Sequence, residues 1–325
     1  MQTWTMALRR LRAAGWLMAA LCLGAPAHAL DWSWLDGQYT RTRHPVVLVH
    51  GLFGFDSIAG VVDYFHGVRE ALSAGGARVY TVQLSAADSH EERGEQLLQQ
   101  LQALQAAHGH ERFNLIGHSQ GGLASRYVAH VAPQLVASVT QVQTPNFGSK
   151  VADWLTQYTI DHPEQGEQLV GLTTELLKVV DWLTGAPDRQ HDVLANIFQL
   201  TTPIATSWNS RYPHGRPNTP CGSGPRVAAN GVHYYSVGGV RVNTNALDLS
   251  DHILGVVSRL GFADGEPNDG LVGRCSTRWG EVLRDDYPWN HLDGINQLLG
   301  LRGLLAPDPL AFYRSHANRL KKAGL

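Results

Sequence analysis

A short apolar run that passes through Gly-His-Ser-Gln-Gly into a helix-forming stretch limits what this chain can fold into. Residues 113–116 are typical of a buried strand and residues 123–131 favour a helix. A serine between them must take strained backbone angles, and the flanking Gly117 and Gly121 leave room for that turn. The hydroxyl then stands clear at the end of the strand. We therefore expect Ser119 to be a nucleophile.

The first half of the chain alternates between apolar runs and helical stretches. Strands are expected at 46–49, 79–84, 113–116 and 136–142, and helices at 68–72, 91–107 and 123–131. The longest of these helices repeats apolar residues at helical spacing, at Leu97, Leu98, Leu101 and Leu104. Such alternation predicts an α/β fold, with a mostly parallel sheet covered by helices.

Composition places the chain among globular proteins and excludes one class of partner. Of its 325 residues, 43% are hydrophobic and 17% are charged. The 26 Lys and Arg residues nearly balance the 28 Asp and Glu residues. This balance argues against binding to a nucleic-acid backbone, which requires a basic face. No composition break marks a second domain, and residues 211–275, rich in Gly, Pro and Asn, are expected to form long loops.

Residues 1–29 have the pattern of a secretory signal peptide. Three arginines without nearby acids precede an apolar run at 13–25, and residues 27–29 read Ala-His-Ala, a small-x-small cleavage site. The alternative, a membrane anchor, needs about 20 apolar residues, and this run is shorter. We predict export and a single domain over residues 30–325.

The cysteine count agrees with export. Removal of the signal peptide leaves Cys221 and Cys275, an even pair in an oxidising compartment. We predict a disulfide between them, with two free thiols as the alternative.

A serine nucleophile requires a base, and the base requires an orienting acid. In this type of fold both follow the serine, the acid first. Eight histidines follow Ser119, and His291 differs from the others because it lies in a polar loop just before an apolar run. Asp269 lies in Asn-Asp-Gly, a tight-turn signal. Composition alone does not choose between Asp269, Asp264 and Asp285.

The choice among these aspartates comes from several sequence motifs that occur in a characteristic order. From about residue 44 to the C-terminus the chain resembles the secreted triacylglycerol lipases of the Pseudomonas and Burkholderia type. Besides the serine motif, the shared stretches are VHGLFGF at 49–55, NDGLV at 268–272, NHLD at 290–293 and HANRLK at 316–321. The resemblance implies an α/β-hydrolase fold with a catalytic triad of Ser119, Asp269 and His291.

The same resemblance implies hydrolysis of long-chain triacylglycerols through an acyl-enzyme. A carboxylesterase, a phospholipase or a polyester depolymerase is the alternative, since the serine motif does not separate them. The oxyanion hole is expected from the backbone N–H groups of Leu52, after the His-Gly strand end, and Gln120, after the nucleophile. These two residues place the chain closer to the Burkholderia branch.

The resembling family also binds one structural calcium ion beside its histidine loop. Its ligand pattern maps onto oxygen atoms of Asp248, Asp293, Gln297 and the carbonyl of Leu301, and calcium prefers such hard donors. From the residues alone, Asp293 is instead predicted to be a helix N-cap. The family's single disulfide matches Cys221–Cys275, where it would brace the loops that lead to Asp269.

A mobile helical lid is expected near residues 152–185, which have apolar positions at helical spacing; the alternative is a plain surface helix. An apolar lid face couples opening to a lipid interface, because the interface covers the surface that opening exposes. The resemblance further implies a membrane-anchored foldase chaperone in the periplasm and release of the enzyme from the cell.

Overall fold

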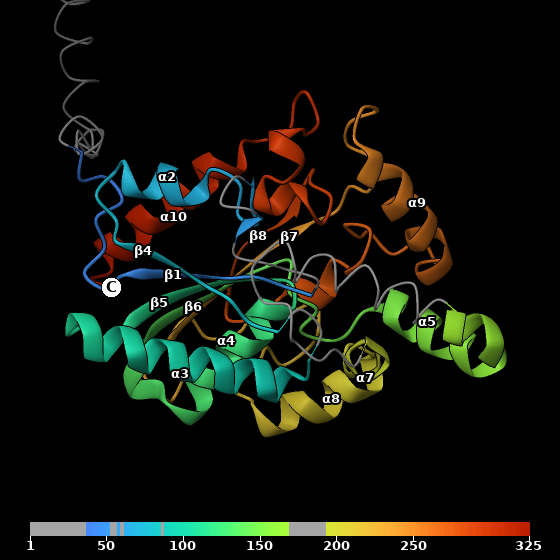
Figure 1. Ribbon diagram of the computed structural model, residues 1–325, viewed down its shortest axis with the longest axis horizontal. Helices are drawn as coiled ribbons and strands as arrows, with labels where there is room; N and C mark the ends of the chain where they lie inside the picture. Colours follow the sequence, from blue (N-terminus) through green and yellow to red (C-terminus); the bar gives the residue numbers. More distant parts are fainter. Residues whose placement is uncertain (1–36, 53–56, 59–61, 86–87, 169–192) are drawn as a thin grey trace, which may run out of the picture. The chain divides into compact units, whose positions relative to one another are not determined.

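Six parallel strands form the sheet of the computed structural model (Figure 1). The structure describes residues 37–325 except 53–56, 59–61, 86–87 and 169–192. The strand order is β4, β1, β5, β6, β7, β8, and a separate antiparallel pair joins β2 to β3. The strands are β1 Val46–Val49, β2 Ser57–Ile58, β3 Val62–Asp63, β4 Val79–Val82, β5 Phe113–His118, β6 Val136–Val142, β7 His233–Gly239 and β8 Glu281–Tyr287.

Helices cover both faces of this sheet. Figure 1 shows α2 and α10 on one face and α3 and α4 on the other. The α-helices are α2 Val68–Ser73, α3 His90–His108, α4 Gln120–Val131, α5 Lys150–Asp161, α7 Val193–Gln199, α8 Thr202–Arg211, α9 Leu249–Gly261 and α10 Pro309–Lys322. Short 3-10 helices follow at η2 Pro133–Leu135, η3 Cys275–Thr277, η4 Asp293–Ile295 and η5 Leu298–Gly300.

The first strand shows why its sequence is apolar without alternation. Val47 and Val49 belong to the core under α3 and α4, whereas Val46 and Leu48 belong to the core under α2 and α10. Every residue of β1 is buried, because a parallel strand inside such a sheet meets helices on both sides. The predicted α/β fold is confirmed.

The predicted elements of the first half are present, with small changes at their ends. Helix α3 begins at a capping box, in which the Ser89 hydroxyl accepts from the Glu92 N–H and the Glu92 carboxylate accepts from the Ser89 N–H. Its Leu97 and Leu101 are fully buried against the sheet. The second predicted strand ends at Val82, two residues before its expected end.

The expectation of long loops over 211–275 was wrong in two places. Strand β7 lies within that range because its backbone is paired on both sides, with β6 and with β8, which no local propensity reveals. Helix α9 also lies there, and Asp248 precedes it as the N-cap, since its carboxylate accepts from the Ser250 N–H. The N-cap predicted at Asp293 is not formed, since that residue is the first of η4 and makes no capping bond there.

Two predictions fall wholly or partly outside the described residues. These are the signal peptide at 1–29 and the lid segment beyond residue 168. Residues 37–325 form one compact unit. Among the helices that the structure describes, none has the length and apolar character to cross a membrane.

Candidate active site

Ser119 lies at the turn between β5 and α4, as predicted. Its backbone has φ 52° and ψ −129°, an unusual conformation for a residue with a side chain. The turn is fixed by a hydrogen bond from the Ser119 N–H to the Val142 carbonyl, at 2.9 Å, at the end of β6. The Ser119 side chain does not cap α4, so its hydroxyl is not used to hold the helix.

The two motif glycines leave the space that this turn requires. A Cβ on Gly121 would lie 2.2 Å from the Val49 carbonyl oxygen, and one on Gly117 would lie 2.5 Å from the Gly121 backbone. Both distances are far below a normal contact. The close approach brings α4 against the end of β1, so the carboxyl ends of β1 and β5 meet beside Ser119. In sheets of this topology, such a crevice is where ligands bind.

His291 and Asp269 form a buried pair. The His291 Nδ1 lies 2.8 Å from the Asp269 Oδ2, and the His291 N–H donates to the Asp269 carbonyl at 2.8 Å. The other carboxylate oxygen, Oδ1, accepts from the N–H groups of Leu271 at 3.0 Å and Val272 at 2.8 Å. Asp269 is fully buried. The carboxylate is therefore held in one orientation, with its Oδ2 directed at the imidazole.

An apolar cavity of about 550 Å³ brings Ser119 and His291 together. Tyr64, Ser149 and Gln297 are the other polar residues of its wall. The apolar residues of the wall are Leu52, Pro145, Val151, Ala152, Leu155, Ile197, Leu200, Leu271, Val272, Leu292 and Ile295. Such a wall suits a hydrocarbon chain, since it offers dispersion contacts and few hydrogen bonds.

A buried chain of hydrogen bonds passes behind the cavity. The His118 Nε2 lies 2.9 Å from the His291 carbonyl oxygen, which can only accept, so His118 donates there. Its Nδ1 then accepts from the Tyr64 hydroxyl at 2.7 Å, and the Tyr64 oxygen accepts from the Gly51 N–H at 3.1 Å. Burial keeps the pKa of His118 well below its ordinary value, so the ring stays neutral. The sequence reasoning missed this chain, although His118 lies inside the serine motif.

Of the two residues predicted for the oxyanion hole, one lines the cavity with Ser119 and the other directly follows Ser119 in the chain. Leu52 follows β1 and lines the cavity. Gln120 is the first residue of α4, where helix geometry leaves the N–H without an intrahelical partner. Its side-chain amide nitrogen donates to the Asp88 carbonyl at 3.0 Å and lies 3.1 Å from the His90 Nδ1. These bonds fix the first turn of α4 against α3.

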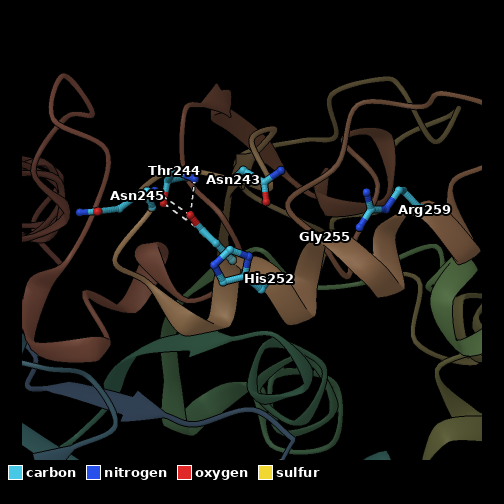
Figure 2. A pocket seen from close by; sticks show the side chains of 8 residues that line it. Asn243, Thr244, Asn245, His252, Gly255 and Arg259 are labelled. Atoms are coloured by element: carbon cyan, nitrogen blue, oxygen red, sulfur yellow. Dashed lines mark hydrogen bonds between the residues drawn. The ribbon is translucent and has the colours of Figure 1, made fainter.

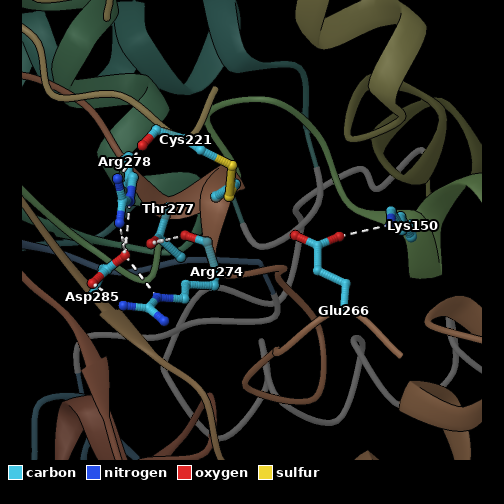
Figure 3. The surroundings of a disulfide bond; sticks show 8 residues. Lys150, Cys221, Glu266, Arg274, Thr277, Arg278 and Asp285 are labelled. Atoms are coloured by element: carbon cyan, nitrogen blue, oxygen red, sulfur yellow. Dashed lines mark hydrogen bonds and ion pairs between the residues drawn. A yellow bond between two sulfur atoms is a disulfide. The ribbon is translucent and has the colours of Figure 1, made fainter. Parts of the chain in front are cut away.

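Cys221 and Cys275 form a disulfide, as the sequence predicts (Figure 3). Beside it, Asp285 accepts from Arg274 Nε at 2.9 Å and from Arg278 Nε at 2.7 Å. Burial raises the pKa of Asp285, but the bonds to the two arginines outweigh burial and bring that pKa below its ordinary value. The Arg278 guanidinium also donates to the Cys221 carbonyl. The disulfide and this ion cluster together fix the segment that follows the Asp269 turn.

Of the residues predicted to bind calcium, Asp293 lies in the His291 loop, and Asp248 is close enough for its charge to act on Asp293. Asp248 and Asp293 are buried, and their charges interact. Asp293 Oδ2 accepts from the Asn290 N–H at 3.0 Å, whereas its buried Oδ1 has no hydrogen-bond partner among the described residues. Gln297 Nε2 donates to the carbonyls of Asp63 and Tyr64, and Leu301 follows η5.

A third carboxylate, Asp251, was missed by the sequence reasoning. It is buried and accepts from the N–H groups of Thr244 and Asn245, at 2.6 Å each, beside a polar surface pocket on α9 (Figure 2). Asp251 Oδ1 also accepts from Asn290 Nδ2 at 2.7 Å. The pKa of Asp293 is raised to about 6, chiefly by burial and also by the charges of Asp251 and Asp248, although hydrogen bonds from Asn290 and Thr244 act in the opposite direction.

These observations bear on whether a calcium ion fits. Within the described residues no group of three or more His, Cys, Asp or Glu side chains is arranged around a common metal position. Three such side chains are not required here, because the predicted calcium ligands include only two carboxylates, those of Asp248 and Asp293. The other predicted ligands are oxygen atoms of Gln297 and of the Leu301 carbonyl. The unpaired Asp293 Oδ1 and the raised pKa of that carboxyl show uncompensated negative charge at this place. A hard divalent cation would compensate that charge, so the residues fit the ion.

Comparison with known proteins agrees with this fold and identifies the family. Residues 44–222 match a family model described as the alpha/beta hydrolase fold. The chain is 49% identical to a triacylglycerol lipase of Vibrio cholerae serotype O1, over 94% of this chain and 96% of that protein. It is 43% identical to a triacylglycerol lipase of Pseudomonas fragi, over 88% of this chain and 98% of that protein. The crystal structure of Staphylococcus hyicus lipase has a TM-score of 0.59 at 19% identity, covering 86% of this chain and 96% of that one.

The fold, with a serine at the turn after β5 and a histidine–carboxylate pair at the same sheet edge, defines an α/β-hydrolase enzyme. Two triacylglycerol lipases that are more than 40% identical to this chain, over most of both chains, show which family of these hydrolases it belongs to. The chain belongs to the family of triacylglycerol lipases. The resemblance inferred from the sequence is thus confirmed.

Proposed function

We propose that this enzyme hydrolyses the ester bonds of long-chain triacylglycerols through an acyl-enzyme on Ser119. One observation carries the proposal: a cavity of about 550 Å³, with mostly apolar walls, has Ser119 and His291 in its lining. Asp269 holds that histidine from behind at 2.8 Å. The names of the relatives from Vibrio and Pseudomonas support a triacylglycerol substrate.

In the proposed mechanism, His291 removes the proton from the Ser119 hydroxyl as the oxygen attacks the ester carbonyl. The imidazolium is stabilised by Asp269, which accepts from Nδ1, and then returns the proton to the leaving glycerol oxygen. Water repeats the sequence on the acyl-enzyme and releases the fatty acid. The N–H groups of Leu52 and Gln120 would bind the oxyanion of both tetrahedral intermediates, where one donor is worth about 3 kcal/mol.

The proposal includes one structural calcium ion held by oxygen atoms of Asp248, Asp293, Gln297 and Leu301. When bound, the ion supplies positive charge between the buried carboxylates and takes no part in the ester chemistry. The Asp293 carboxylate already accepts from the Asn290 N–H, one residue before the proposed base. Fixing Asp293 therefore fixes the position of His291.

The proposal also includes a lid over the cavity. The described part of the expected segment contains α5, whose Ala152 and Leu155 lie in the cavity wall. Lys150, the first residue of α5, pairs with Glu266 at 2.7 Å (Figure 3), in the loop that leads to Asp269. Displacement of α5 would open the cavity and expose its apolar wall, and a lipid surface would cover that wall.

Export through the periplasm to the medium, with the help of a membrane-anchored foldase, completes the proposal. The N-terminal pattern and the disulfide support passage through an oxidising compartment. The foldase and the release from the cell rest on the resemblance alone. Expression of the exported chain with and without a foldase of a relative, followed by assay of active enzyme per milligram, tests that part.

The main test compares two substrates for the purified mature enzyme. One is an emulsified long-chain triacylglycerol titrated through its solubility limit, and the other is a soluble short-chain ester. We expect the rate on the triacylglycerol to rise sharply when the emulsion forms, and Ser119→Ala to abolish both rates. Hydrolysis of the soluble ester alone would identify a carboxylesterase instead, and retained activity in the serine variant would reject Ser119 as the nucleophile.

A further inference from the structure

Gln143 combines a strained backbone with a buried position beside the proposed triad. It follows β6 directly, its backbone N–H donates to the Val237 carbonyl at 2.8 Å, and its φ is 51°. This left-handed conformation is unfavourable for a residue with a side chain, whereas glycine adopts it freely. Because glycine is the residue that this backbone favours, the glutamine side chain itself requires an explanation.

The side-chain amide contacts two parts of the site at once. Gln143 Nε2 donates to the Asp269 Oδ2 at 2.9 Å and to the Asn290 carbonyl at 2.8 Å. That carboxylate oxygen is the one that the His291 Nδ1 also contacts, at 2.8 Å. The Gln143 amide therefore links two groups: the Asp269 oxygen that orients His291, and the peptide that precedes His291.

The two acceptors around Gln143 fix the orientation of its amide. Both acceptors are oxygen atoms, so reversing the amide would place its own oxygen against a carboxylate. A Cβ on Gly294 would lie 1.8 Å from the Gln143 Oε1, and one on Gly239 would lie 2.7 Å from its Nε2. Within the described residues Oε1 accepts no hydrogen bond, which costs free energy for a fully buried group. The fold thus keeps the amide in place despite two local costs, with one N–H bond to Asp269 and one to the peptide that precedes His291.

We propose that Gln143 is a positioning residue that holds the Asp269 carboxylate and the His291 loop in register for proton transfer. The inference rests on the proposed triad. Without the amide, Oδ2 keeps only its bond to His291, and the Asn290–His291 peptide loses an anchor on the sheet side. Gln143 does not line the cavity, so its loss should act on the proton-transfer steps rather than on substrate binding.

The experiment compares Gln143→Met with Gln141→Met in the full mature enzyme. Methionine matches the shape of glutamine but has no N–H donor. Gln141 lies two residues earlier in β6, is equally buried, and has no hydrogen-bond partner for its amide among the described residues. We expect kcat on a soluble ester to fall in Gln143→Met by on the order of 10- to 100-fold with KM unchanged. We expect Gln141→Met to keep the kcat of the parent enzyme.

Active sites are counted by titration with a phosphonate inhibitor, so that misfolded protein does not count as slow enzyme. A Gln143→Met enzyme with parent kcat per titrated site would overturn the proposal, even if its melting temperature falls. Gln143→Gly is a second variant. It removes the amide, and glycine adopts the positive φ at this position without strain. We expect the same loss of kcat there, and parent kcat in the glycine variant would also overturn the proposal.

Failure of this inference is distinguishable from failure of the proposed function. If Ser119→Ala is inactive and Gln143→Met is fully active, the triad stands and the role of Gln143 falls. If Ser119→Ala remains active, the proposed mechanism itself is rejected and no role near Asp269 follows.

Discussion

His118 Nε2 donates to the His291 carbonyl at 2.9 Å, so the residue before the proposed nucleophile is bonded to the proposed base. Their imidazole rings lie 4.7 Å apart. Through Tyr64 the same chain reaches Gly51, next to the proposed oxyanion donor Leu52. Three separate loops at the sheet edge therefore share one buried hydrogen-bond chain.

Tyr64→Phe should weaken this chain without changing the shape of the core. The change leaves the Gly51 N–H and the His118 Nδ1 without their described partner, and a buried unpaired polar group costs about 1–3 kcal/mol. We expect a matching loss in the free energy of unfolding in urea, with reduced kcat/KM. Tyr235→Phe is the control, because within the described residues the hydroxyl of this buried tyrosine makes only a 3.5 Å contact to His233. Equal stability losses in the two variants would contradict the role of the chain.

Asp269→Asn should reduce kcat by about 10⁴-fold, since an amide in place of the carboxylate no longer fixes the imidazole in the required tautomer. Steady-state kinetics on a soluble ester measures the effect. The matched control is Asp285→Asn, which removes a carboxylate bonded to Arg274 and Arg278 and should lower stability more than kcat. A large loss of kcat in Asp285→Asn and a small loss in Asp269→Asn would show that Asp285, not Asp269, is the triad acid.

Removal of the disulfide by a double Cys221→Ser, Cys275→Ser change should lower the free energy of unfolding. The bridge joins residues 54 positions apart, and the chain-entropy relation gives about 4 kcal/mol for a loop of that size. Urea unfolding of the double variant and of the oxidised parent measures the difference. A difference below about 1 kcal/mol would show that the Asp285 ion cluster holds the segment without the bridge.

Chelation of calcium should lower the melting temperature and the activity together, because the ion would hold Asp293 and hence His291. Calcium added back should restore both, whereas magnesium should not, since its rigid octahedral geometry suits this mixed oxygen set poorly. In Asp248→Asn and Asp293→Asn, the calcium-dependent rise in melting temperature should shrink. A parent enzyme whose melting temperature is the same in chelator and in calcium would remove the ion from the proposal.

Stability should fall as pH decreases from about 6.5 to about 3, in part because of His316. Burial, and to a smaller extent the Arg319 charge, lowers the pKa of His316 to about 3. Below pH 6.5, the ordinary pKa of histidine, His316 is protonated in the unfolded chain but stays neutral in the folded protein. The free energy of unfolding therefore loses about 1.4 kcal/mol per pH unit from this group.

The measurement is urea unfolding at several pH values for the parent and for His316→Gln, which can still contact the Thr140 hydroxyl that lies 2.6 Å from the His316 ring. We expect a shallower decline with falling pH in the variant. Parallel curves for the two proteins would show that His316 does not contribute.

Elements with a local signal could be predicted from the residues alone. The apolar run of β5, the two glycines and the helix after them predicted the turn at Ser119, because a tight strand–helix turn has few residue types that fit it. The residues also selected His291 from its setting, but they did not choose among three aspartates. That choice came from the resemblance, and the 2.8 Å contact of His291 with Asp269 agrees with it.

Features that depend on contacts between distant segments became visible only in the folded chain. Strand β7 exists because two neighbours pair with it, and its Gly- and Asn-rich surroundings hide it from local patterns. Gln143 shows the same limit at the site, since it lies 126 residues before the aspartate that its amide contacts. A left-handed glutamine is costly by its own propensity, and the cost is offset by hydrogen bonds that form only when β6, the Asp269 turn and the His291 loop meet.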